Sequence, residues 1–87
     1  MIEFTVYSRH GCHLCEDLLQ QLIQLQQVHG FKITDVDIDL NPQLIEQYGS
    51  LVPVVTCGDE QICHYFLDQA AILQLLKDKQ KGRVRDV

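Results

Sequence analysis

Apolar and polar residues follow two different periods in the first half of the chain. Residues 2–6 alternate between apolar and polar positions, as in a strand that packs one face against a core. From about Cys12 to His29, apolar residues recur every three or four positions, as on the buried side of a helix, and Gly30 follows where helices commonly end. Residues 31–39 return to a strand-like pattern. The first half is therefore predicted to form a strand, a helix and a second strand.

A short second helix is predicted after this unit. Asn41 is a favourable N-cap, and Pro42 suits the first helical position because its ring presets the helical φ angle. Leu40 before the cap and Ile45 inside the helix are spaced for a hydrophobic staple. Gly49 marks the end of the helix.

A hairpin and a third helix complete the chain. Residues 51–57 and 61–65 form the two strands, with Gly58-Asp59 as the tight turn, and Asp68 caps the last helix. The order is β-α-β-α-β-β-α. A strand–helix–strand opening implies a parallel pair with a right-handed crossover, whereas the hairpin adds an antiparallel pair. We predict an α/β fold with a four-stranded mixed sheet flanked by helices.

Length and charge limit the number of domains and the classes of partner. The 87 residues suffice for one domain, which we place at residues 1–80, followed by a short basic tail at 81–87. Residues 1–76 hold ten acidic against two basic residues, a net charge of −8, whereas residues 77–87 have a net charge of +3. An acidic body argues against a nucleic-acid partner.

The sequence also bears on location. No apolar run approaches the roughly 20 residues of a membrane span, and the first residues lack the basic leader and cleavage site of a signal peptide. We therefore expect a cytoplasmic monomer that binds no membrane. In that compartment, closely spaced cysteines are more often redox-active or metal-binding than structural.

The stretch from His10 to Cys15 carries the chemistry. Cys12 and Cys15 are neighbours on the first turn of a helix, close enough for a disulfide. Cys12 can attack a partner disulfide as a thiolate, and Cys15 can then resolve the mixed disulfide. The helix N-terminus favours the thiolate, and Arg9 and a protonated His10 or His13 would lower the pKa of Cys12 further. Between a strand and a helix, this spacing indicates a redox motif.

Two other functions use the same cysteines. With His10 or His13, they would suit zinc or cuprous ions, although a second ligand pair at fixed spacing is not evident. An adaptor domain of this fold, with vestigial cysteines, is the third hypothesis. Cys57 and Cys63, on either side of the hairpin turn, are interpreted as small strand residues rather than a second redox pair.

Three local matches carry a resemblance that covers nearly the whole chain. They are Tyr7-Ser8-Arg9 leading into Cys12-x-x-Cys15, then Leu51-Val52-Pro53, then Gly58-Asp59. The chain resembles the glutaredoxin branch of the thioredoxin superfamily, and in particular the small bacterial glutaredoxin-like proteins. The resemblance implies a thioredoxin-like fold and a thiol–disulfide oxidoreductase with a part in cell redox homeostasis, in which Cys12 and Cys15 are catalytic.

The resemblance also implies a substrate site. Pro53 would be cis and would face the nucleophile, and Val52 would offer its backbone to an extended substrate. Arg9 stands where glutaredoxins often place a lysine that contacts a glutathione carboxylate, and an arginine can pair with a carboxylate in the same way. We expect Arg9, His13, Val52 and Pro53 to contact substrate. The partners would be a protein disulfide or glutathione, with glutathione or a thioredoxin-reductase-type protein as reductant, and no tightly bound cofactor.

The chain departs from the glutaredoxin pattern in two places. His13-Leu14 replaces the usual Pro-Tyr between the cysteines, and residues 62–68 lack the glycine pair that holds a glutathione carboxylate. A protein disulfide is therefore a substrate of nearly equal standing with glutathione. By family analogy, loss of the motif proline would also permit a shared iron–sulfur cluster.

Overall fold

The computed structural model describes residues 2–85, and side chains through residue 79. Its elements, in chain order, match the predicted β-α-β-α-β-β-α order with one short 3₁₀ helix added. They are β1 (Glu3–Ser8), α1 (His13–His29), β2 (Lys32–Asp37), η1 (Ile38–Leu40), α2 (Pro42–Tyr48), β3 (Val54–Cys57), β4 (Glu60–His64) and α3 (Gln69–Arg85). Within these residues, no helix combines the length and the apolar character needed to cross a membrane.

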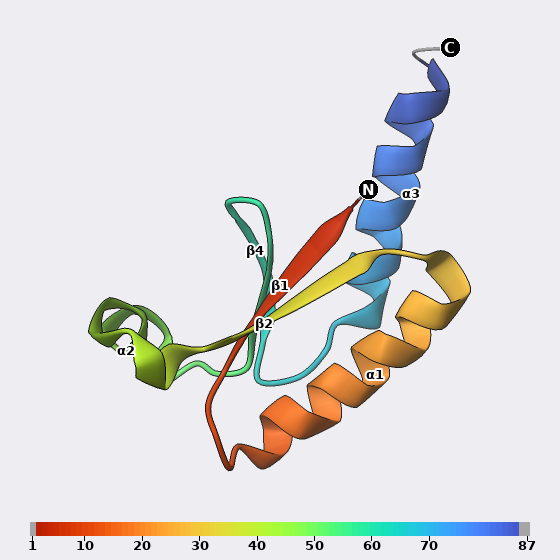
Figure 1. The fold of residues 1–87 in the computed structure, drawn as a ribbon. Helices are drawn as coiled ribbons and strands as arrows, with labels where there is room; N and C mark the ends of the chain where they lie inside the picture. The colour runs from red at the N-terminus through yellow and green to blue at the C-terminus, as the bar shows by residue number, and fades with distance from the viewer. Residues whose placement is uncertain (1, 86–87) are drawn as a thin grey trace.

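The strands form a four-stranded mixed sheet in the order β2-β1-β3-β4. β1 runs parallel to β2 and antiparallel to β3, and β3 runs antiparallel to β4. Figure 1 shows α1 as the connection from β1 to β2, and the β3–β4 hairpin follows on the other side of β1. The predicted fold class is therefore confirmed.

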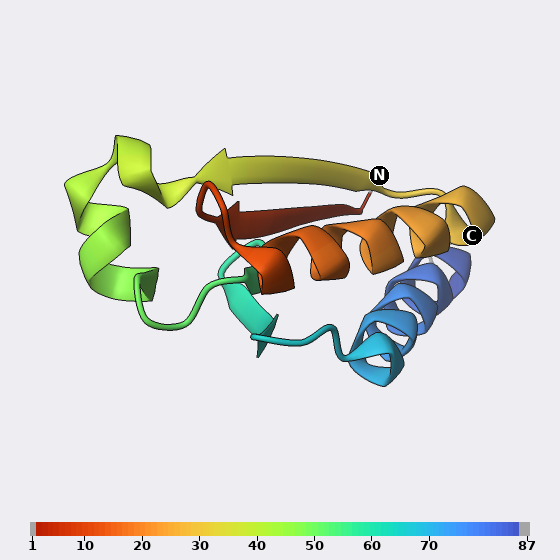
Figure 2. The same cartoon turned by 90° about the horizontal axis from the view of Figure 1, so that it is seen from below.

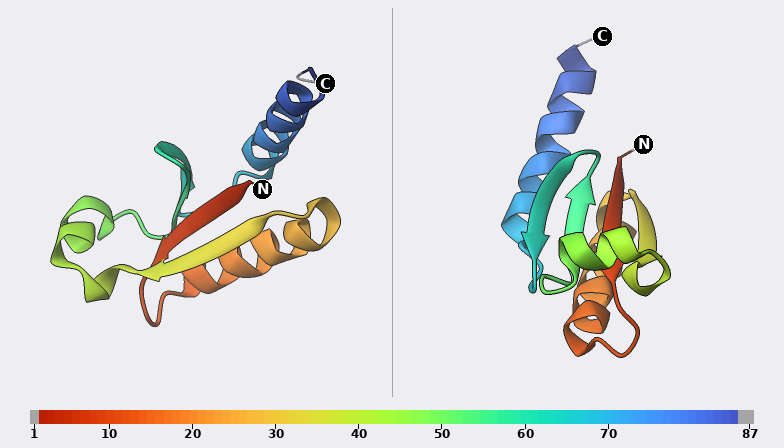
Figure 3. Two further views of the ribbon diagram at one scale, coloured as in Figure 1. Left: turned by 45° about the horizontal axis from the view of Figure 1, so that its top comes forward. Right: turned by 90° about the vertical axis from the view of Figure 1, so that its left-hand side faces the viewer.

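α1 and α3 cover the same face of the sheet, whereas α2 lies beyond the end at which β2 finishes (Figures 2 and 3). The core fills the space between the sheet and these two helices. Phe4 and Phe31 meet edge to face there, with ring centroids 5.0 Å apart. The buried cluster comprises Phe4, Val6, Leu18, Leu22, Phe31, Val55, Ile72 and Leu76. Side chains from strands and helices thus form one hydrophobic core, and burial of its apolar surface is the main stabilising term.

α1 forms as its apolar period predicts. Cys15, Leu18 and Leu22 lie on its buried side, at helical spacing. The helix ends where the N–H of Gly30 donates to the carbonyl of Gln26 at 2.8 Å, and Gly30 has a φ of +67°, which glycine adopts without a steric cost.

The segment before α2 differs from the prediction. The second strand ends at Asp37 rather than 39, because the Asp37 carboxylate accepts the N–H of Asp39 at 2.9 Å and turns the chain into η1. Leu40, at the end of η1, is 83% exposed. The predicted hydrophobic staple to Ile45 is therefore wrong, because it would require a covered Leu40.

The predicted cap of α2 is confirmed. The side-chain oxygen of Asn41 accepts the N–H of Gln43 at 2.9 Å. Asn41→Ala is expected to lower the free energy of unfolding by about 1 kcal/mol, because it leaves that N–H without its partner. Asn41→Ser keeps a capping oxygen and should retain most of the stability. Urea unfolding followed by circular dichroism compares the two variants, and equal losses would contradict the capping role.

The start of the third strand also differs from the prediction. β3 begins at Val54 rather than Leu51, because the N–H groups of Leu51 and Val52 donate to the carbonyl of Tyr48, at 2.8 and 3.1 Å, instead of entering the sheet. α3 continues to Arg85, so residues 81–85 of the predicted tail are helical. Lysine and arginine favour helices and suit a helix C-terminus. Residues 86–87 of the predicted tail lie outside the described part of the chain.

Candidate functional site

Cys12 and Cys15 lie at the junction between β1 and α1. The N–H of Cys12 donates to the carbonyl of Arg9 at 3.3 Å and closes the loop, in which Gly11 has a φ of +77°. Cys12 is the N-cap of α1, and the N–H of Cys15 donates to its Sγ at 3.1 Å. The two sulfurs form a disulfide, with the Cα atoms 5.2 Å apart, within the usual range.

The two cysteines differ in exposure. Cys12 is half-buried at the chain corner, whereas Cys15 is 2% exposed beneath it. A reduced Cys12 would keep the N–H of Cys15 and the positive end of the helix dipole beside its sulfur, and both favour the thiolate. The geometry therefore gives an accessible thiol that can attack a partner and a covered thiol that can attack only its neighbour.

Pro53 lies at the same end of the sheet as the cysteines. The register pairs Tyr7 of β1 with Val54 of β3, so Pro53 comes at the level where β1 leads into the cysteine loop. Pro53 is buried, and the Val52–Pro53 peptide bond is cis. The N–H of Val52 donates to the carbonyl of Tyr48, so this N–H already has a partner within the chain.

A third loop, which follows β4, lies at this end of the molecule. The N–H of Tyr65 donates to the carbonyl of Pro53 at 2.9 Å, and its hydroxyl donates to the carbonyl of Ser50 at 2.8 Å. Tyr65 and Phe66 also line a small pocket together with Leu14, which lies between the two cysteines. Tyr65 and Phe66 are thus neighbours of the site that the sequence did not single out.

Arg9 and His13, which were predicted to contact substrate, both lie at the surface. Arg9 donates from Nε to the Oδ1 of Asp39 at 3.0 Å, and its Nη2 lies 2.8 Å from the same oxygen. The structure therefore gives Arg9 a carboxylate partner within the chain, and a substrate carboxylate would compete with Asp39. His13 is almost fully exposed, and its Nδ1 lies 4.0 Å from a carboxylate oxygen of Glu16. Asp39 was not assigned a role from the sequence.

Cys57 and Cys63 are free thiols in the structure. Both are half-buried and pack against the hydrophobic core. Burial raises the pKa of the Cys63 thiol, which disfavours the reactive thiolate. These features fit the interpretation of the two cysteines as packed strand residues.

In the fully reduced protein at neutral pH, iodoacetamide is expected to label Cys12 well before Cys63, because the thiolate is the reacting form and burial disfavours it at Cys63. Mass spectrometry of timed samples gives the order of labelling. In the oxidised protein, the disulfide should protect Cys12 entirely. Labelling of Cys63 as fast as Cys12 would contradict this assignment.

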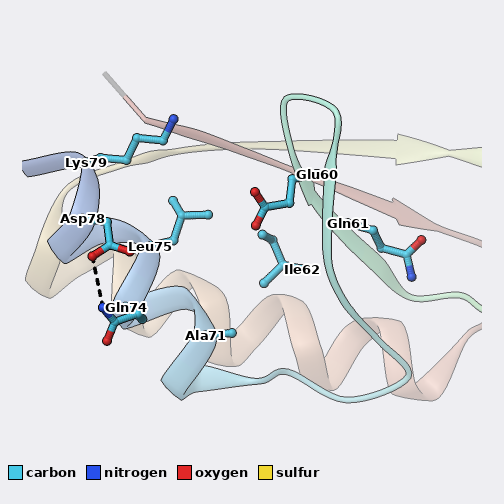
Figure 4. A pocket seen from close by; sticks show the side chains of 8 residues that line it. All are labelled: Glu60, Gln61, Ile62, Ala71, Gln74, Leu75, Asp78 and Lys79. Carbon is cyan, nitrogen blue, oxygen red and sulfur yellow. Dashed lines mark hydrogen bonds between the residues drawn. The ribbon is translucent and has the colours of Figure 1, made fainter. Parts of the chain in front are cut away.

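Another pocket lies away from the cysteines. A cavity of about 420 Å³ opens between β4 and α3. Figure 4 shows Glu60, Gln61 and Ile62 on one wall and α3 residues on the other, where Gln74 donates to Asp78. None of its lining residues belongs to the loops around the cysteines. In the described part of the chain, no three His, Cys, Asp or Glu side chains gather in an arrangement that could hold a metal ion.

Comparison with known proteins finds similar chains of known structure. The sequence model of a glutaredoxin-like domain (DUF836) matches residues 3–77. Protein Ne2328 from Nitrosomonas europaea, solved by NMR, is 38% identical with a TM-score of 0.78, over 85% of this chain and 89% of that chain. Protein XcR50 from X. campestris is 28% identical with a TM-score of 0.64, over 86% of this chain and 96% of that one.

Two further comparisons agree with these. Uncharacterized protein Rv0508 from Mycobacterium tuberculosis is 28% identical over 72 residues, which are 77% of this chain and 74% of that protein. The germline-specific thioredoxin Deadhead from the fruit fly, Drosophila melanogaster, is 14% identical with a TM-score of 0.55, over 88% of this chain and 79% of that chain. This last likeness shows that the chain shares the thioredoxin fold.

Proposed function

Because the chain belongs to the glutaredoxin-like (DUF836) family of the thioredoxin superfamily, we propose that it is a thiol–disulfide oxidoreductase acting through Cys12 and Cys15. The observation that carries the proposal is the Cys12–Cys15 disulfide at the N-terminus of α1, formed by one half-buried and one buried cysteine. Exchange requires this difference in exposure, because the first thiol must reach the substrate disulfide and the second must lie next to the first.

The reaction proceeds in two balanced steps. The Cys12 thiolate attacks one sulfur of a substrate disulfide, forms a mixed disulfide and releases the other substrate sulfur as a thiolate. The Cys15 thiolate then attacks the Sγ of Cys12, closes the Cys12–Cys15 disulfide and releases the remaining substrate thiol. Two electrons pass to the substrate. A cellular reductant, glutathione or a thioredoxin-reductase-type protein, restores the dithiol by the reverse exchange.

The surrounding residues would place the substrate. In the proposed complex the carbonyl of Val52 accepts an N–H from an extended substrate chain, and buried Pro53 fixes the loop that carries it. Exposed His13 contacts substrate at the outer side of the cysteine turn. Arg9 binds a substrate carboxylate only when Asp39 releases it. The proposed setting is the cytoplasm, where reduced thiols are maintained.

Redox titration tests the proposal. Purified protein, first assayed for bound metal, is equilibrated in dithiothreitol or glutathione buffers from about −300 to −150 mV, trapped with an alkylating reagent and weighed by mass spectrometry. Reversible conversion of the Cys12–Cys15 pair supports exchange. Stoichiometric zinc, copper or an iron–sulfur cluster held by both cysteines, or the absence of a reversible bond across this range, would refute the proposal.

A further inference from the structure

The pocket between β4 and α3 is lined by residues that the proposed chemistry does not use. Its volume is about 420 Å³, and we call it the β4–α3 groove. Half-buried Ile62, Ala71 and Leu75 form its apolar floor, whereas Glu60 and Asp78 lie exposed at its rim. Ligand sites commonly have a volume of this order and combine apolar surface with a few polar groups.

A β-bulge contributes to the apolar floor. The pairing of β4 with β3 passes from Thr56–Gln61 to Val55–Cys63, so Ile62 is an extra residue in β4. A bulge changes the direction of a side chain, and here both Ile62 and Cys63 pack against the hydrophobic core. Figure 4 shows Ile62 pointing from β4 toward α3. Because β4 is the last strand of the sheet, this apolar floor lies at an open edge.

Carboxylates lie on both walls of the groove. Glu60 belongs to β4, and its carboxylate points toward α3 (Figure 4). Asp78 belongs to α3, where the Nε2 of Gln74 donates to its Oδ1 at 3.0 Å. A carboxylate accepts more than one hydrogen bond, so Asp78 can accept a second N–H group from a ligand. Lys79 is the cation among the lining residues, so these two acids and one lysine give the lining a net charge of −1.

An arginine side chain is complementary to both the lining and the charge. Its aliphatic stem packs on apolar surface while its guanidinium group stays in contact with water at the rim. The planar guanidinium group has five N–H donors and can serve more than one carboxylate, whereas a lysine ammonium acts as a compact charge. The surroundings add to the attraction, because residues 1–76 have a net charge of −8. The volume of the groove exceeds that of one side chain, so it also has room for neighbouring residues of a partner.

We propose that the β4–α3 groove is a docking site for a protein partner. An arginine of the partner packs its stem on Ile62 and Leu75, and its guanidinium group donates to the carboxylates of Glu60 and Asp78. The lining residues are separate from the loops around the cysteines, so a segment bound in the groove does not occupy the cysteine site. This inference is independent of the proposed function, since binding in the groove involves no thiol.

Two matched peptides test the groove. They are acetyl-Ala-Arg-Leu-amide and the same peptide with citrulline in place of arginine, which replaces the guanidinium group by a neutral urea group. Each is titrated into ¹⁵N-labelled oxidised protein, and the backbone N–H shifts are followed by NMR. We expect the arginine peptide to bind about fivefold tighter, the upper end of the range for an exposed ion pair. The largest shifts should fall on residues 60–62 and 71–79.

The ratio of the two affinities is then compared among variants. Glu60→Gln combined with Asp78→Asn keeps an acceptor oxygen at each position but removes both charges, so the ratio should fall close to one. Lys79→Gln removes the like charge in the lining and should raise the affinity for the arginine peptide about twofold. Glu46→Gln, the control, removes an exposed acid in α2 and should leave the ratio unchanged.

Three results would overturn the proposal. They are equal binding of the two peptides to the parent protein, shifts confined to other elements, and a ratio retained by the double variant. Sedimentation of the peptide-free protein tests another occupant, the basic segment at residues 77–87 of a second copy. Self-association that the double variant abolishes would assign the groove to that second copy and overturn the proposal, whereas a monomer supports it.

Discussion

Cys12→Ser is expected to lower the rate of disulfide exchange roughly 10³-fold or more, because a serine hydroxyl cannot form the mixed disulfide on which turnover depends. The assay is reduction of hydroxyethyl disulfide with dithiothreitol as the electron donor. Cys12 is only half-buried, so the substitution should leave the unfolding transition of the reduced protein nearly unchanged.

Cys15→Ser is the matched control, since it removes the other sulfur of the same pair. This variant keeps the attacking thiol and should still react once with a disulfide, but it cannot close the Cys12–Cys15 bond. Single-turnover attack should therefore survive in Cys15→Ser and vanish in Cys12→Ser. Equal losses in the two variants would refute the separate roles of attacking and resolving thiol.

Phe4→Ala is expected to have the largest effect on stability, lowering the free energy of unfolding by about 3–5 kcal/mol. Phe4 is fully buried in β1 and packs edge to face against Phe31, so the substitution removes both buried area and an aromatic contact. Domains of this size are stable by only about 5–15 kcal/mol, so much of the stability would be lost. Chemical unfolding at several urea concentrations measures the change.

Val28→Ala provides the comparison on the same scale, because Val28 is 76% exposed and lies outside the core. It should change the free energy of unfolding by less than about 0.5 kcal/mol. A Phe4→Ala loss no larger than that of Val28→Ala would mean that the core does not lie where the sheet meets α1 and α3.

The parts of the molecule that follow from local pattern were predictable. The period of α1, the Asn41 cap and the Cys12–Cys15 pair each depend on residues within one or two helical turns. Such features are specified by neighbours in the sequence, so they need no knowledge of the tertiary structure.

The parts that depend on distant residues were not predictable. The Arg9–Asp39 pair joins residues 30 positions apart, and nothing in the local sequence of either residue signals it. The turn at η1, which exposes Leu40, follows from an Asp37 side-chain bond that competes with the strand.

Tyr65 was missed for a different reason. Rules for a positive φ favour glycine and asparagine, so a tyrosine gives no turn signal. Tyr65 makes tertiary hydrogen bonds to the carbonyls of Ser50 and Pro53 in that conformation. A motif defined by residue type and spacing, such as the cysteine pair, is therefore easier to find than a loop that tertiary contacts place.

Trapping the mixed disulfide tests the central claim most directly. Reduced Cys15→Ser protein is mixed with a peptide disulfide, quenched in acid, digested and analysed by mass spectrometry without reduction. The account predicts one dominant adduct, in which the peptide is bonded to Cys12. Adducts distributed among Cys12, Cys57 and Cys63, or no adduct at Cys12, would contradict it.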